Sequence, residues 1–138
     1  MVYNVTDFPF AEFGEEGKTR KVRLVVSPET TGEKRLSIVF TSVPAGAISE
    51  GHIHEDFDEY IYFDIGGKVS LDGKAFDVPE HGLVHAKAGV KHECVNTHAD
   101  KTLNLFCVFV PPLKPYGKYP DLIKVTKAYL DGEKHNST

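Results

Sequence analysis

The sequence predicts an all-β domain, built as a sandwich or a barrel, and two features of the chain indicate it. Short apolar runs rich in Val, Ile, Leu and Phe recur along the sequence, and Gly, Pro, Asp or Asn separates them. Asp72 and Gly73 form the strongest hairpin signal, because a type I′ turn requires positive φ angles at both central residues. The 138 residues suffice for one domain of ordinary size.

Each expected strand is an apolar run bounded by turn residues. In chain order these runs cover residues 21–27, 35–43, 60–65, 68–71, 75–78, 92–96 and 102–110. Residues 111–120 contain four of the eight prolines, so this segment should leave the sheet and cross the surface. Apolar residues at 122, 123, 125, 129 and 130 then predict a short C-terminal helix over 121–130, starting near Pro120 or Asp121.

We expect these elements to form one domain over residues 1–138. Its barrel core should span about 35–112, preceded by N-terminal strands in 1–34 and followed by a C-terminal extension over 113–138. The hydrophobic fraction of 41% and the charged fraction of 26% are typical of a soluble globular protein.

The net charge and the lack of a recognisable targeting signal limit the partners and the cellular compartment that we expect. A net charge of -4 argues against a nucleic acid or an anionic membrane as partner. No run approaches the roughly 18 apolar residues that span a bilayer, and residues 1–13 lack the pattern of a secretory signal. We therefore expect a cytoplasmic protein with reduced thiols at Cys94 and Cys107, although counting alone leaves a disulfide open.

A candidate metal site begins with His52 and His54. The two residues are spaced i, i+2, so on a strand both imidazoles point to the same face and can reach one ion. Glu59 follows an acidic stretch that is expected to form a solvated turn or bulge, after which a returning strand can present its carboxylate beside the histidines. His92 lies in a second expected strand, after the turn-forming Gly89.

The ligand types restrict the metal. Three imidazoles and one carboxylate suit one divalent transition-metal ion (Mn, Fe, Co, Ni, Cu or Zn) and suit Ca or Mg poorly. The set differs from the thiolate cage of a structural zinc site. On an octahedral ion it leaves two positions for water, oxygen or a chelating substrate, which is the arrangement that metal catalysis uses. Taken alone, His52 and His54 have a second interpretation, as a pair of solvated surface residues.

Two segments resemble the motifs of the cupin superfamily. Residues 46–66 resemble the first motif, which here reads Gly46, five residues, His52-Ile53-His54, four residues, Glu59, six residues and Gly66. Residues 87–96 resemble the second motif, in which Gly89, His92 and Asn96 match. Lys87 stands where the family usually has proline, and Gly82 is one residue closer than usual. The resemblance implies a small single-domain cupin, a jelly-roll barrel or double-stranded β-helix, with one metal ion on His52, His54, Glu59 and His92.

Strand alternation places the neighbours of these ligands. Ile61 and Phe63 share the face of Glu59 and should form an apolar pocket wall, while Cys94 shares the face of His92 and packs as a small hydrophobe. Tyr60 and Tyr62 should point into the opposite layer and have a packing role. Asn96 should close a turn through side-chain-to-backbone hydrogen bonds. We expect His81, His85 and His98 to lie in loops or at the rim of the barrel.

The resemblance also implies a function class. Similar small cupins include dioxygenases, decarboxylases, sugar isomerases, lyases and polyketide cyclases, which act on small polar molecules through Lewis-acid chemistry. The sequence names no convincing general acid or base, although Glu59, Glu50 and His85 are candidates. The alternative is a non-catalytic sensor or binding module. A regulatory protein usually carries a DNA-binding domain, and 138 residues leave no room for one, so this hypothesis is the weaker of the two.

Two partners are expected. The first is a small-molecule ligand or substrate at the metal. The second is another copy of the chain, because an open jelly roll has edge strands that need cover and single-domain cupins are often dimers. Residues 2–10 and 21–27 have the composition to pair across the two-fold axis of such a homodimer.

Overall fold

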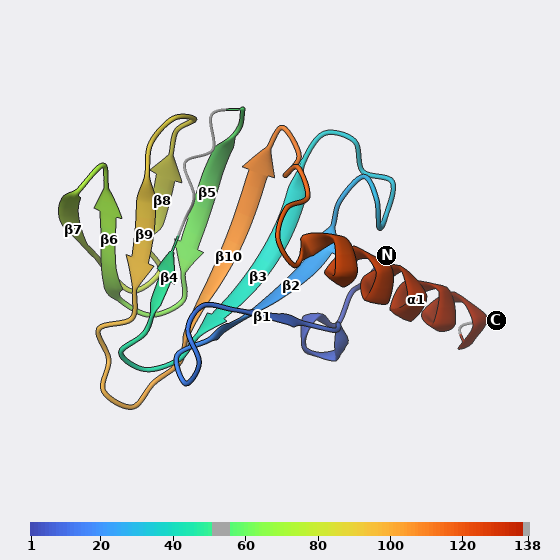
Figure 1. Cartoon of the computed structure of the whole chain (residues 1–138), viewed down its shortest axis with the longest axis horizontal. Helices are drawn as coiled ribbons and strands as arrows, with labels where there is room; N and C mark the ends of the chain where they lie inside the picture. Colours follow the sequence, from blue (N-terminus) through green and yellow to red (C-terminus); the bar gives the residue numbers. More distant parts are fainter. Residues whose placement is uncertain (51–55, 137–138) are drawn as a thin grey trace.

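The computed structural model describes residues 1–50 and 56–136, and it describes the side chains of these residues as far as position 132. Within this part of the chain the strands form two antiparallel sheets around a common core (Figure 1). The six-stranded sheet has the order β1 (Ala11–Phe13), β2 (Arg20–Val26), β3 (Ser37–Val43), β10 (Leu103–Val110), β5 (Asp58–Phe63) and β8 (Leu83–Ala86). The four-stranded sheet has the order β4 (Ile48–Glu50), β9 (His92–Val95), β6 (Gly67–Leu71) and β7 (Lys74–Val78).

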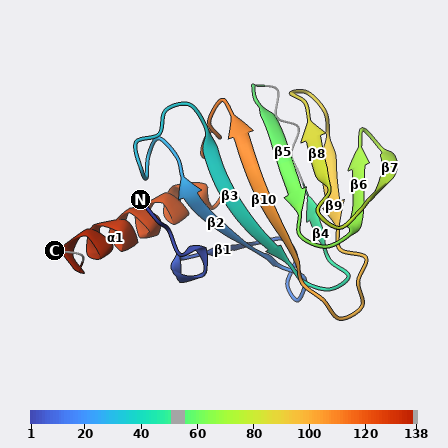
Figure 2. The same ribbon diagram turned by 180° about the vertical axis from the view of Figure 1, so that it is seen from behind.

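Two helices complete the fold. The 3₁₀ helix η1 (Val5–Asp7) lies near the N-terminus, and the α-helix α1 (Tyr119–Asn136) ends the described chain. Figures 1 and 2 show α1 beside β2, on the side away from the four-stranded sheet. Among the described residues, no helix combines the length and the apolar character that a membrane crossing requires. The predicted all-β jelly roll with a C-terminal helix is therefore confirmed.

Burial alternates along the strands that form the core. In β3 the side chains of Val39, Thr41 and Val43 point inward, and the intervening ones are partly exposed. The same pattern in β10 buries Leu105 and Cys107, because successive side chains of a strand point to opposite faces. The interior of the barrel is thus lined by every second residue, and polar residues with that spacing face the interior as well.

The Asp72–Gly73 turn is confirmed. Asp72 has a φ of 50° and Gly73 a φ of 81°, and the two residues connect β6 to β7. Both central residues of the hairpin loop thus have the positive φ angles that a type I′ turn requires.

Several expected elements differ from the structure. The short strands β1, β4 and β8 were not predicted, and residues 2–10 contain η1 and no strand. Helix α1 begins before Pro120 and extends beyond Leu130, because the polar residues after the last apolar position include good helix formers. Residues 111–118 leave the sheet as predicted, but this segment does more than cross the surface, since Leu113 is buried in the core.

Asn96 closes the turn that follows β9, as predicted. Its side-chain amide donates hydrogen bonds to the carbonyls of Val43 and Lys101 at 3.0 and 2.7 Å, and its amide oxygen accepts one from the backbone N–H of His98 at 2.9 Å. The side chain is fully buried, so these bonds satisfy groups that water cannot reach. They hold one end of the strand that carries His92.

Candidate metal centre

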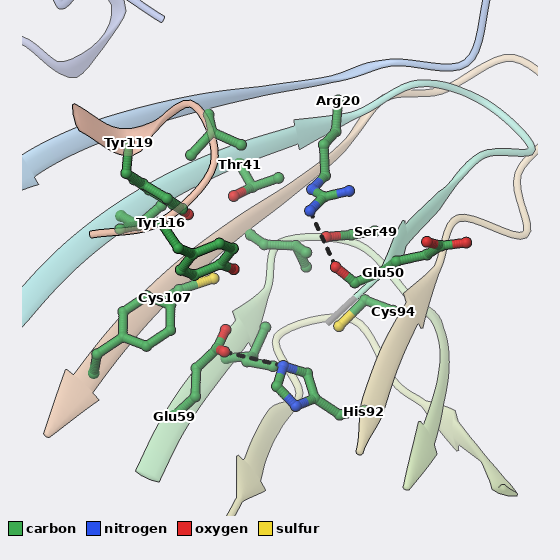
Figure 3. Close-up of a pocket in the computed structure, with 15 residues that line it drawn as sticks. Arg20, Thr41, Ser49, Glu50, Glu59, His92, Cys94, Cys107, Tyr116 and Tyr119 are labelled. Carbon is green, nitrogen blue, oxygen red and sulfur yellow. Dashed lines mark hydrogen bonds and ion pairs between the residues drawn. The ribbon is translucent and has the colours of Figure 1, made fainter. Parts of the chain in front are cut away.

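Glu59 and His92 face each other across the interior of the barrel. Glu59 lies on β5 in the six-stranded sheet, and His92 begins β9 in the four-stranded sheet. Their exposed fractions are only 7% and 4%, and Oε1 of Glu59 lies 3.0 Å from Nε2 of His92 (Figure 3). Each sheet thus contributes one buried ionisable side chain to a common point in the interior of the barrel.

The turn before His92 is fastened to the strand that carries Glu59. The N–H of Val90 donates to the carbonyl of Lys87 at 3.0 Å, and Gly89 has a φ of 84°, a left-handed conformation that favours glycine. The carboxylate of Asp58 accepts a hydrogen bond from the N–H of Ala88 at 2.9 Å. Because Asp58 precedes Glu59, this bond fixes the start of β5 relative to the turn that leads into β9.

The two site residues influence each other's charge. Burial alone lowers the pKa of His92, but the hydrogen bond and negative charge of Glu59 outweigh it, so the pKa of this imidazole is raised. A backbone hydrogen bond with Val90 acts in the same direction on the pKa of His92. Glu59 and His92 thus form a buried, directly contacting pair of polar groups.

A cavity of about 40 Å³ adjoins this pair (Figure 3). Its lining combines apolar residues with polar groups from several strands and from the segment before α1. The apolar residues are Val22, Val39, Ile61, Leu105 and Phe109. The polar and sulfur-containing residues are Arg20, Thr41, Ser49, Glu50, Glu59, His92, Cys94, Cys107, Tyr116 and Tyr119.

Two of the three predicted pocket residues line this cavity. Ile61 and Cys94 do so, but Phe63 does not. Phe63 shares the inward face of β5, yet it lies four residues beyond Glu59, or ~13 Å along the strand. It packs in the core, where its ring is close to Gly67.

The two cysteines are free thiols, as expected for reduced residues. Burial raises the pKa of both the Cys94 and the Cys107 thiol, and the nearby negative charge of Glu59 raises it further. Both thiols therefore stay protonated and pack as small hydrophobes, which is the role that the sequence indicates for Cys94.

His81, His85 and His98 contact residues outside the cavity, although His85 lies on strand β8, where a loop or rim position was expected. Nε2 of His85 lies 2.9 Å from Asp58, and its ring stacks on Tyr60 with the centroids 4.3 Å apart. His81 contacts the hydroxyl of Tyr62 in the same outer layer. His98 lies 2.6 Å from the carbonyl of Gly66. Tyr60 and Tyr62 thus point away from Glu59, as strand alternation requires.

The acidic stretch before Glu59 has two roles in its described part. Asp56 pairs with Lys114 at 2.9 Å on the surface, as expected for a solvated residue. Asp58 instead starts β5, where the hydrogen bonds from Ala88 and then from His85 lower its pKa. Glu55 lies outside the described residues.

His52 and His54 lie outside the described residues, so the structure leaves their predicted role as ligands untested. In the part of the chain that is described, no group of three or more His, Cys, Asp or Glu side chains forms a metal site. Of the described residues on either side of 51–55, Glu50 lines the cavity directly before this stretch, and Glu59 lines it a few residues after.

Five polar lining residues were missed by the sequence analysis, namely Arg20, Thr41, Ser49, Tyr116 and Tyr119. The strand pattern contained a signal for Arg20, because it has the same alternation as the buried Val22 and Leu24. The two tyrosines carried no such signal, since they come from the proline-rich segment and the start of α1.

A larger hollow of about 550 Å³ lies between the N-terminal residues and α1. Its described lining contains one carboxylate, that of Asp7, and no histidine or cysteine. The larger hollow therefore lacks the donors for a transition metal, and the barrel interior is the candidate site.

The donors in the barrel suit the metal that the sequence implies. Glu59 and His92 offer one oxygen and one nitrogen ligand within hydrogen-bond distance, and both are almost fully buried. Carboxylate and imidazole together favour a divalent transition metal over Ca or Mg. Two of the four predicted ligands, Glu59 and His92, therefore lie close enough together to bind the same ion.

The sequence matches no protein-family model and no curated protein, whereas many solved structures match the fold. A predicted oxalate decarboxylase from Thermotoga maritima has a TM-score of 0.68 and 19% identity, over 80% of this chain and 99% of that one. Ectoine synthase from P. lautus has a TM-score of 0.65 and 17% identity, over 96% and 85% of the two chains. The Cnp3 cupin domain of Schizosaccharomyces pombe has a TM-score of 0.61 and 12% identity, over 80% and 73%. The chain therefore has the cupin fold.

Proposed function

We propose that this cupin-fold chain is a metal-dependent enzyme that acts on a small, oxygen-rich organic molecule. The observation that carries the proposal is the buried pair of Glu59 and His92 beside an internal cavity. His52 and His54 would complete the ligand set, and the chain places them between two residues of the same site. A bound divalent transition-metal ion would supply Lewis-acid activation of a carbonyl, enol or hydroxyl group.

The chain's own residues would orient the guest and control protons. Burial raises the pKa of Tyr116 and of Tyr119, so both phenols keep their protons and can donate hydrogen bonds to an oxygen of the guest. Val39, Ile61 and Leu105 give the cavity an apolar part of its wall, against which the carbon atoms of a guest can pack. Burial of Glu59 and His92 strengthens the charge interactions between these groups and a guest.

Similar structures support an enzyme without specifying its reaction. Two of them bear the names of enzymes, a predicted oxalate decarboxylase and an ectoine synthase. Dioxygenase, decarboxylase, isomerase, lyase and cyclase chemistry all agree with a buried ion beside a small cavity. The two buried free thiols support a reducing compartment, and we propose the cytoplasm.

The test starts with protein purified without chelators and without a histidine-rich tag. Elemental analysis should find close to one transition-metal ion per chain, and the loaded protein should convert at least one member of a panel of hydroxy acids, oxo acids, diols and enols. Metal and guest binding without turnover would favour the alternative, a binding or sensor module. A protein that binds no metal would exclude the metal-dependent enzyme and leave the binding module as the remaining hypothesis.

We also propose that the protein is a two-fold homodimer. Strand β2 is paired on both sides, with β1 and with β3, so residues 21–27 cannot pair across the two-fold axis as was expected from the sequence. The edges of the six-stranded sheet are β1 and β8, and Leu83 on β8 has an exposed fraction of 66%. An open edge with an exposed apolar side chain needs cover. Light scattering at micromolar concentration should therefore give twice the chain mass of 15.3 kDa. A mass near 15.3 kDa contradicts the dimer, and a Leu83→Glu variant tests whether this edge forms the interface.

A further inference from the structure

Arg20 brings a positive charge into the barrel. On β2 it alternates with Val22 and Leu24, which are buried, and its own side chain is half-buried. Figure 3 shows its guanidinium on the opposite side of the cavity from Glu59 and His92. Of the described lining residues, Arg20 is the sole lysine or arginine.

Within the described part of the chain, the guanidinium has few partners. Nη2 donates to the carbonyl of Glu50 at 3.0 Å, and Cζ lies 5.5 Å from the ring centroid of Phe13. No carboxylate of the described residues lies within 4.0 Å of it. A guanidinium has five N–H donors, and among the described residues one backbone carbonyl accepts from them and no carboxylate matches the charge.

The positive charge of Arg20 lowers the pKa of tyrosine and cysteine side chains that line the cavity. Burial raises the pKa of Tyr119 and of Cys94, and Arg20 opposes that rise in the pKa of each. It has the same lowering effect on the pKa of Tyr116 and of Cys107. The negative charge of Glu59 outweighs Arg20 at Tyr119, Cys94 and Cys107, so the attraction for an anion is local to the guanidinium, and Figure 3 shows Arg20 on the side of the cavity away from Glu59.

We propose that Arg20 binds a carboxylate of the substrate, an inference that rests on the proposed function and names its substrate class. The planar guanidinium fork matches the two oxygens of a carboxylate. The guest would be a small 2-hydroxy or 2-oxo acid, whose charged end lies at Arg20 and whose second oxygen donor lies toward Glu59 and His92. Uncharged diols and enols have no negative charge for this arginine to bind.

The test compares acids with their uncharged amides. Glycolate, lactate and pyruvate, together with glycolamide, lactamide and pyruvamide, are titrated into metal-loaded wild type and Arg20→Gln protein by calorimetry. Arg20→Gln should weaken the binding of at least one acid tenfold or more and leave amide binding unchanged. Arg20→Lys, which keeps the charge but lacks the fork, should give an intermediate loss.

Arg23→Gln is the matched control. Arg23 lies on the same strand, its Nε donates to the carbonyl of Phe8 at 3.1 Å, and its Cζ lies 5.1 Å from the ring of Phe10, outside the cavity. This variant should bind the acids as wild type does. The melting temperature of each variant, measured without ligand, separates a folding defect from a binding defect.

Metal content, measured in the same samples, separates the two proposals. Arg20→Gln should keep the wild-type complement of metal, because a guanidinium is not a ligand. A metal-loaded wild type that binds none of the acids, or equal acid affinities in wild type and Arg20→Gln, would overturn the carboxylate site and leave the metal centre intact. If the protein binds no metal, the proposed enzyme fails, and the carboxylate site stands only if the acids still bind and Arg20→Gln abolishes that binding.

Discussion

Replacing His92 by alanine is expected to lower the metal affinity at least tenfold and to leave most chains without metal after purification. His92 is almost fully buried, and its Nε2 lies 3.0 Å from Oε1 of Glu59, so no solvent-exposed side chain can readily take its place. Losing even an outer partner of a metal ligand typically reduces affinity roughly 10–100-fold, and losing the ligand itself should cost no less. Elemental analysis of freshly purified protein measures the effect.

His81→Ala is the control for this experiment. It also removes one imidazole, but the His81 side chain is 66% exposed and lies on the outer layer beside Tyr62. This variant should retain the wild-type metal content. Equal losses in the two variants would show that metal binds to surface histidines, and the centre in the barrel would then have no support.

Folding must be followed in parallel, because His92→Ala leaves the carboxylate of Glu59 buried without its imidazole. Removing one partner of a buried pair costs about 3–5 kcal/mol, and the melting temperature should fall accordingly. Glu59→Gln avoids this problem, since a neutral amide of the same shape keeps a hydrogen-bonding group beside His92 while removing the negative charge. Weak metal binding in folded Glu59→Gln protein therefore reports on the ligand and not on unfolding.

His52 and His54 complete the test, because they enter the prediction through the sequence alone. The double variant His52→Ala, His54→Ala removes half of the expected ligand set and no described contact. Its metal content should be close to zero. A full complement of metal in that variant contradicts the four-ligand assignment, whatever the His92 variants show.

Much of the site was predictable because strands have a period of two. That single rule placed Ile61 on the inward face with Glu59, turned Tyr60 outward and put Cys94 on the face of His92. Spacing within one or two strands is short-range information, and a sequence contains it directly. The same rule failed for Phe63 because sharing a face does not fix the depth along the strand.

The missed features depend on contacts between distant parts of the chain. The strands β1 and β4 have three residues each, too few for an alternation to be recognised, and they form only because β2 and β9 offer them an edge. Tyr116 and Tyr119 reach the cavity because the segment after β10 folds back over the barrel, which no local pattern predicts. The alternation along β2 indicated that the side chain of Arg20 faces inward, but a charged residue is normally expected on the surface of a protein.

A small chelating acid is expected to raise the melting temperature of the metal-loaded protein by about 10 °C at a concentration near 100 times its Kd. The described cavity walls combine apolar side chains with polar groups that include Arg20, Glu59 and His92, so a guest that binds there should carry oxygens both for the ion and for Arg20. Binding to the folded state alone stabilises a protein by about 2.7 kcal/mol at that concentration. Differential scanning fluorimetry measures the shift, with lactate as the first probe.

Two control measurements test whether the rise in melting temperature depends on the bound metal. The metal-free protein should show no comparable rise with lactate, and propionate, which lacks the second oxygen donor, should raise the melting temperature of the loaded protein far less. Protein loaded with Co²⁺ should also change its visible absorption spectrum when lactate is added, because the guest alters the surroundings of the ion. If the spectrum and the melting temperature stay the same across a broad panel of hydroxy acids, oxo acids, diols and enols, the metal is a closed structural centre. The cavity beside Glu59 and His92 then cannot be where a substrate is activated.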